Sequence, residues 1–280
     1  MKVKREGSLS RRCVLRRAMA GAFGVTVAGS LGESRLLDVT RHSLAIQSLP
    51  AALSPLKVAF AADFHLGDWF PIRKVRESVD AINRLGADLI LLGGDYVTES
   101  PDFYPAVFAE LSRLRAPMGV YAVPGNHDNW GGAGRFLDEI SRTDIVPLVN
   151  EGVDLSGLWV AGLDDMWGGG VDWQRATARK PPDAAVIAVG HNPYTADELP
   201  SGAADLILAG HTHGWQVYIP LVSRALIPEN MSKYRCGFYR TAAGLMYVTR
   251  GVGLSLSRIR WWCRPEATLF ELRAPDGSVS

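Results

Sequence analysis

The chain has 280 residues, of which 47% are hydrophobic and 21% charged, and its formal net charge is +1. This composition excludes an intrinsically disordered protein, and the length allows one domain with a large core. Residues 1–30 carry seven basic side chains and one acidic side chain, which leaves a net charge of −5 on the rest, so we expect no nucleic-acid partner.

The first 32 residues predict an export signal. A basic segment, residues 1–17, precedes an uncharged stretch, residues 18–32, which is shorter than the about 20 apolar residues of a membrane span. Residues 10–16 resemble the twin-arginine consensus, with Val14 where Phe is usual. A basic disordered tail is the alternative, but the order of the two parts favours a signal. We expect twin-arginine export machinery to carry the protein to the periplasm or the outer face of the inner membrane, with the segment cleaved or kept as an anchor.

Five short apolar runs, bounded by Gly or Pro, predict buried strands covered on both faces. They span residues 57–62, 88–92, 120–123, 184–189 and 205–209. Helical spacing of apolar residues predicts helices at residues 71–85, 103–114 and 131–140. Further strands are expected at residues 158–162, 216–219, 245–249 and 267–272. This alternation predicts an α/β fold of two packed sheets with helices outside, in one domain over residues 36–273, with a flexible tail at 274–280.

A polar cluster follows each of the five apolar runs, where loops after strand ends can converge on one point. Five of the six histidines lie in these clusters. Imidazole, carboxylate and one carboxamide together form a ligand set for Mn, Fe or Zn. Any one of these histidines alone would be read as an ordinary loop or core residue, but the set predicts a metal site. The clusters are Asp63-Phe64-His65, Gly94-Asp95, Gly125-Asn126-His127-Asp128, Gly190-His191 and Gly210-His211-Thr212-His213.

This ordered set resembles the signature of the calcineurin-like metallophosphoesterase superfamily. Residues 247–253 and 264–269 are similar to the tail of its YkuE/YaeI/LpxG group. The resemblance implies a four-layer α/β/β/α sandwich. It also implies a metal-dependent phosphoric ester hydrolase, a phosphodiesterase or pyrophosphatase, that cleaves P–O bonds with a metal-bridging hydroxide.

The resemblance also implies two divalent metal ions, with Mn favoured and Fe or Zn as alternatives. Two cations about 3.5–4 Å apart can lower the pKa of a shared water and clamp the attacking and leaving oxygens. The implied ligands are Asp63, His65 and His213 for the first ion and Asn126, His191 and His211 for the second, with Asp95 bridging both.

Two further residues of the third cluster are expected to act in catalysis. His127 would face the leaving-group oxygen as general acid or transition-state donor. Asp128 would orient the His127 ring, and its alternative role is the N-cap of the helix expected at residues 131–140.

Several aromatic and basic residues are candidates for the rim of the site. Residues 167–170, Trp215 and the loop at residues 234–239 would surround it. Arg250 would meet a phosphate or serve ordinary packing, and packing is favoured. Residues 258–262 have the composition of a membrane-interface patch, with a lead-in to the last strand as the favoured alternative.

The substrate is the least constrained expectation. A small-molecule or lipid phosphoester, lipid-linked or nucleotide, fits the implied chemistry. A UDP-2,3-diacylglucosamine pyrophosphatase of lipid A synthesis is an alternative that export argues against. The second alternative is a non-catalytic binding module on the same fold, and the complete ligand set argues against it. Cys236 and Cys263 are expected either to pair in an oxidising compartment or to remain free thiols.

Overall fold

The computed structural model describes residues 36–98, 100–220, 222–223, 227, 229–255 and 257–275. The export signal predicted at residues 1–32 lies outside the described residues, as do residues 276–280 of the predicted tail. Within the described ranges, no helix has the length and apolar character needed to span a membrane.

The first sheet has six strands in the order β1-β12-β2-β3-β4-β5. Its neighbours are parallel except for β12 and β2, which pair antiparallel. The last strand in the chain therefore lies between the first two. The strands are β1 Asp38–Ala45, β2 Leu56–Ala61, β3 Leu89–Leu92, β4 Val120–Ala122, β5 Val146–Pro147 and β12 Glu266–Arg273.

The second sheet also has six strands, in the order β10-β11-β9-β8-β7-β6. Its four central strands are parallel, and the two edge strands pair antiparallel with their neighbours. The strands are β6 Glu151–Asp154, β7 Leu158–Gly162, β8 Ala185–Val189, β9 Leu206–Ala209, β10 Gly237–Arg240 and β11 Leu245–Val248.

Three apolar layers hold the sheets and helices together. Phe60, Leu91 and Ile187 belong to the layer between the two sheets, and Ala59 and Ala61 point into the layer under the helices of the first sheet. The period of two along β2 divides its side chains between these layers. The predicted four-layer α/β/β/α sandwich is confirmed.

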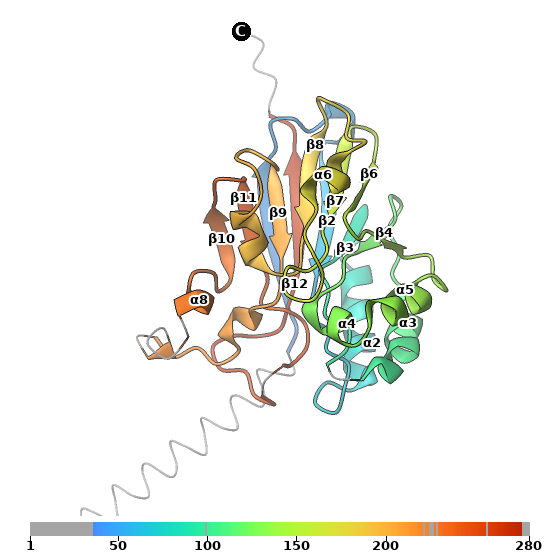
Figure 1. The fold of residues 1–280 in the computed structure, drawn as a ribbon, viewed down its shortest axis with the longest axis vertical. Helices are drawn as coiled ribbons and strands as arrows, with labels where there is room; N and C mark the ends of the chain where they lie inside the picture. Colours follow the sequence, from blue (N-terminus) through green and yellow to red (C-terminus); the bar gives the residue numbers. More distant parts are fainter. Residues whose placement is uncertain are drawn as a thin grey trace, which may run out of the picture.

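The helices lie on the outer faces of both sheets (Figure 1). α2 Ile72–Asn83, α3 Tyr104–Leu111 and α5 Ala133–Ile140 correspond to the three predicted helices. Short α4 Asn126–Trp130 precedes α5, while α6 Trp173–Thr177 covers the second sheet. Within the described residues, the other short elements are α8 Glu229–Ser232 and the 3-10 turns η1 Ala51–Leu53, η2 Pro101–Phe103, η3 Pro193–Asp197 and η4 His213–Trp215.

One predicted strand is wrong. Residues 216–219 form no strand, and only an isolated bridge joins Val217 to Trp261. The reason is the backbone just before it, because Trp215 and Gln216 have φ values of 65° and 51°. These left-handed conformations are incompatible with an extended chain.

A buried carboxylate, Glu266 in β12, ties the two sheets together. Its Oε1 accepts hydrogen bonds of 2.7 Å from Thr40 in β1 and from Tyr247 in β11 of the other sheet. Arg250 adds an ion pair of 3.2 Å to the same oxygen. Burial alone would raise the pKa of Glu266, but the Arg250 charge together with the hydrogen bonds from Arg250 and Thr40 outweighs burial and lowers it. The favoured interpretation of Arg250 as a packing residue agrees with these contacts.

Glu266→Gln should therefore lower the free energy of unfolding by about 3 kcal/mol, the lower end for breaking a buried ion pair. Because the folded-state pKa of Glu266 is depressed, its contribution is present above the unfolded-state pKa and is lost as pH falls through the folded one. The free energy of unfolding of the wild type, measured with urea, should thus fall below about pH 4.5. In the variant this free energy should depend less steeply on pH in the acid range. Glu77→Gln removes an exposed ion pair and is the control. Equal losses in both variants would contradict the role of Glu266.

Candidate metal centre

The five polar clusters meet at one edge of the molecule because each follows the carboxyl end of a parallel strand. Three clusters leave β2, β3 and β4 of the first sheet, and two leave β8 and β9 of the second. The structure brings all seven predicted metal ligands to this edge. They are Asp63, His65, Asp95, Asn126, His191, His211 and His213.

The ligand loops turn sharply through left-handed backbone. Five of the seven ligands have positive φ, a region that non-glycine residues rarely adopt and that costs about 1–3 kcal/mol each. A Cβ on Gly210 would lie 2.6 Å from Asp63 Oδ2, and one on Gly125 would overlap Asp95 Oδ1. The glycines in the motifs therefore allow two loops to touch. The positive-φ ligands are Asp63, His65, Asp95, His211 and His213.

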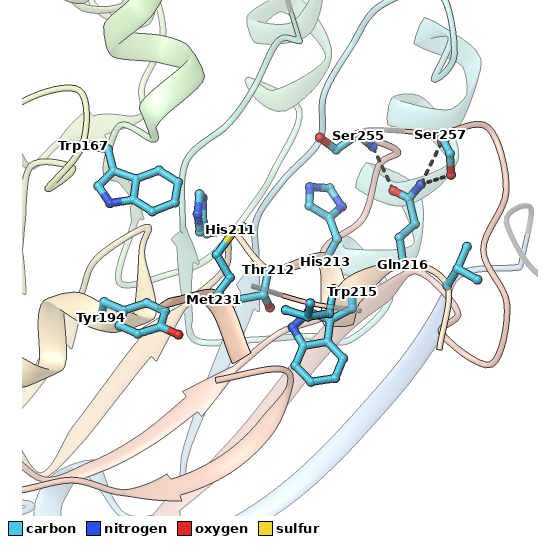
Figure 2. Close-up of a pocket in the computed structure, with 12 residues that line it drawn as sticks. Trp167, Tyr194, His211, Thr212, His213, Trp215, Gln216, Met231, Ser255 and Ser257 are labelled. Carbon is cyan, nitrogen blue, oxygen red and sulfur yellow. Dashed lines mark hydrogen bonds between the residues drawn. The ribbon is translucent and has the colours of Figure 1, made fainter. Parts of the chain in front are cut away.

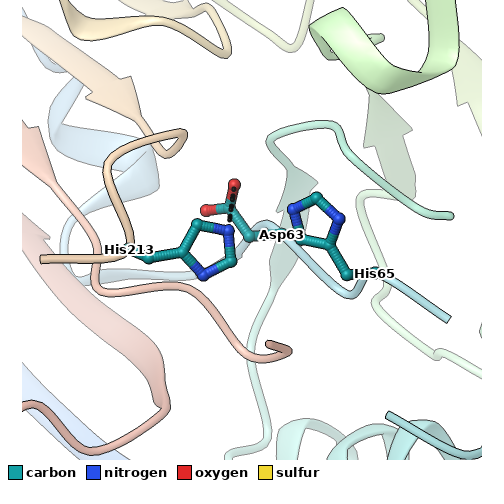
Figure 3. Close-up of side chains that lie close together, drawn as sticks. All are labelled: Asp63, His65 and His213. Atoms are coloured by element: carbon teal, nitrogen blue, oxygen red, sulfur yellow. Dashed lines mark ion pairs between the residues drawn. The ribbon is translucent and has the colours of Figure 1, made fainter. Parts of the chain in front are cut away.

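The first group of donor atoms comprises Asp63, His65 and His213, whose ligand atoms lie within 4.8 Å of one another (Figure 3). His213 Nε2 is 3.5 Å from Asp63 Oδ1, and His65 Nε2 is 3.3 Å from Asp95 Oδ2. All three side chains are buried. The buried Nε2 atoms of His65 and His213 have no hydrogen-bond partner, as expected of nitrogens that bind a cation.

The second group comprises Asp95, His191 and His211, with Asn126 beside them. His191 Nε2 is 3.1 Å from Asp95 Oδ2, and His211 Nδ1 is 2.9 Å from Asn126 Oδ1. His191 Nδ1–H donates to the Gly93 carbonyl at 2.7 Å, so Nε2 is the ring nitrogen that faces Asp95 and would bind a cation in place of its proton. Asp95 thus belongs to the second group and also contacts His65 of the first.

The electrostatics of the cluster suit cation binding. Burial alone would raise the pKa of Asp95, but His191 and His65 outweigh it and hold that pKa well below its usual range. Burial, and then the His191 charge, lower the pKa of His211 to about 3, so its ring is neutral and can act as a ligand. The oxygen and imidazole donors fit a divalent metal centre.

His127 lies beside the first group without sharing its contacts to Asp63. Its ring packs edge-on against His65, with centroids 4.9 Å apart, and also against Trp130. His127 Nδ1–H donates to the Thr98 carbonyl at 2.5 Å, because a carbonyl only accepts. Burial lowers the pKa of His127. Because Nδ1 is held by Thr98, Nε2 is the ring nitrogen left to meet a substrate.

Asp128 does not have the role expected for it. Its Oδ2 accepts from the backbone N–H groups of Gly125 and Asp95, both at 2.8 Å, and Oδ1 accepts from Tyr96. Thr98, not Asp128, holds the His127 ring. Asp128 lies at the third position of α4 and caps that helix rather than α5. It fixes the backbone of two ligand loops.

A pocket of about 180 Å³ opens next to His211 and His213 (Figure 2). Trp167 and Trp215 line it, as predicted, and Tyr194 and Met231 are lining residues that the sequence reading missed. The loop at residues 234–239 is not among the lining residues and supports the pocket indirectly, because Tyr234 packs its ring against Tyr194 and Tyr239.

Arg260 is a third residue whose position the sequence did not predict. Residues 258–262, for which a lead-in to the last strand was favoured over a membrane-interface patch, contain this arginine, and its side chain is fully buried. The guanidinium donates to the carbonyls of Gly253 at 2.6 Å and Gly251 at 3.1 Å, and lies 3.2 Å from His213 Nδ1. Trp262 in the same segment is exposed. Cys236 and Cys263 are free thiols.

Comparison with known proteins identifies this arrangement. Residues 56–215 match the calcineurin-like phosphoesterase family. The chain belongs to that family. It is 31% identical to phosphodiesterase YaeI of Escherichia coli, over 92% of this chain and 99% of that protein. It is 28% identical to the uncharacterised metallophosphoesterase YkuE of Bacillus subtilis, over 93% and 98%.

A solved structure also has the fold of this chain. TT1561 of Thermus thermophilus superposes with a TM-score of 0.50 at 15% identity, covering 71% of this chain and 91% of that one. Family membership and the donor cluster together make the protein a metal-dependent phosphoester hydrolase with a divalent metal centre.

Proposed function

We propose that the protein hydrolyses phosphodiesters with two divalent cations, Mn favoured, held by the two donor groups that share Asp95. The observation that carries this proposal is the position of Asp95 Oδ2, 3.3 Å from His65 Nε2 and 3.1 Å from His191 Nε2. A carboxylate between two such groups can bridge two ions. When bound, the ions would activate a water and neutralise charge on the phosphoryl oxygens. The name of the relative YaeI supports a diester preference.

The protein's own residues would position the substrate and move one proton. Asn126 supplies a neutral ligand beside His211, which avoids adding negative charge where a phosphate must approach. His127 Nε2 would donate a proton to the departing alkoxide from the imidazolium form. The Thr98 carbonyl accepts from Nδ1–H and stabilises that form.

We also propose that the enzyme acts outside the cytoplasm, on a lipid-linked or nucleotide phosphoester. Arg11-Arg12 and the uncharged stretch after them support export by the twin-arginine route. That route carries folded proteins, so the metal centre would be loaded before export.

Chelation should abolish hydrolysis of bis-p-nitrophenyl phosphate, and Mn should restore it better than Mg. Metal analysis should find about two equivalents in the parent, about one in His213→Ala and almost none in Asp95→Ala, because Asp95 contacts both donor groups. Asp138→Ala, an exposed change on α5, is the control. Active parent protein holding well under one equivalent would contradict the two-ion centre.

His127→Ala should keep both metals and lose most of its turnover on a diester with an alkoxide leaving group. General acid catalysis contributes about 10²–10⁴-fold, so a loss in that range is expected there. The loss should be much smaller with p-nitrophenolate, which leaves without a proton. Steady-state rates on both substrates, with metal content measured in parallel, make the test. Equal losses or a missing metal would assign this histidine another role.

Replacing Arg11 and Arg12 together by lysine should leave the protein in the cytoplasm, since the export receptor recognises the guanidinium pair. Cell fractionation and immunoblotting measure the outcome. Arg16→Lys with Arg17→Lys keeps the pair and serves as the matched control. Unchanged export of the first variant would rule out this route.

A further inference from the structure

The pocket beside the metal centre has mainly apolar walls and borders two of the predicted metal ligands. His211 and His213, one from each donor group, form one side of it. Trp167, Trp215 and Met231 contribute to the other walls (Figure 2). A substituent on a phosphorus atom held at the two donor groups would therefore lie within reach of this pocket.

The volume of the pocket sets the size of what it can hold. A dry cavity of about 150 Å³ binds benzene, so the 180 Å³ here accommodates a unit of roughly six carbon atoms. Ile219 and Val222 are exposed apolar side chains that follow the lining residue Val217 along the chain. A longer chain could continue along them.

Two polar side chains of the pocket, Gln216 and Tyr194, are already paired within the protein, which argues against a nucleobase. The Gln216 amide donates to the Ser257 carbonyl at 2.8 Å and accepts from the Ser255 N–H at 3.0 Å. The Tyr194 hydroxyl accepts from the Lys233 N–H at 3.1 Å. A buried donor that does lack a partner is Trp215 Nε1. One such donor does not match the several donors and acceptors on the edge of a base.

From these observations we infer that the pocket binds the aliphatic chain of the substrate, so that the enzyme prefers a lipid phosphoester over a nucleotide. The inference rests on the proposed function, because it assigns a substrate class to the same metal centre. Chain burial would supply binding free energy in proportion to the methylenes removed from water.

The test uses n-alkylphosphonates from methyl to octyl as competitive inhibitors of the Mn-loaded full chain, with binding also measured by isothermal titration calorimetry. The dissociation constant should fall about fourfold for each methylene up to about six carbons, and more slowly thereafter. A constant that does not change with chain length would overturn the inference. So would phenylphosphonate binding more tightly than hexylphosphonate, which would assign the pocket to an aromatic group.

A cavity-filling variant locates the effect. Met231→Trp adds volume at a lining residue that is 37% exposed, and should lower the preference for hexyl over methyl phosphonate at least tenfold. Leu137→Trp, at a position 41% exposed on α5 and outside the lining set, should keep the parent preference. A preference kept by Met231→Trp would place the chain elsewhere and overturn the inference. Circular dichroism melting confirms that both variants are folded.

The two proposals fail in different ways. If metal-loaded protein hydrolyses no phosphoester and binds no phosphonate, the proposed function is wrong and the inference falls with it. If it hydrolyses bis-p-nitrophenyl phosphate but shows no chain-length dependence, only the aliphatic site is wrong.

Discussion

Asp95 contacts donor groups from both sheets at once, and the relative position of the two sheets makes this contact possible. His65 reaches it from the loop after β2, and His191 from the loop after β8 in the other sheet. Two sheets can deliver these groups only if the carboxyl ends of their strands share an edge. The apolar layer between the sheets holds that alignment. It also offsets the cost of left-handed backbone at five of the ligands.

The sequence was informative wherever a buried parallel strand ended in a ligand. Such strands are continuous apolar runs, and the turn that follows needs glycine, so both features appear in one short stretch of sequence. For that reason the strands before Asp63, Asp95 and His191, and the meeting of their loops, were predictable. The layers followed as well, since each run must be covered on both faces.

Other features depend on contacts that no local pattern encodes. β1 was not predicted because it is a partly exposed edge strand whose polar residues interrupt any apolar run. Asp128 was given the wrong partner because its neighbour in sequence, His127, bonds to Thr98 instead, from a loop of a different strand. Arg260 lies next to two tryptophans in sequence, as in a surface patch. Arg260 is instead buried because its guanidinium donates to backbone carbonyls of residues 250–253, which the folded chain places around it.

The position of β12 has a consequence for biosynthesis. Within the described residues, β1 pairs only with β12, and β12 in turn pairs with β2. The loop preceding β12 also donates from Gly253 N–H to the carbonyl of Asp63. The first sheet cannot be completed until residues 266–273 have left the ribosome, and the backbone around this ligand cannot be completed before residue 253 has. The nascent chain therefore reaches its final topology after translation of nearly the whole domain, and folding intermediates before that point lack a finished metal-binding edge.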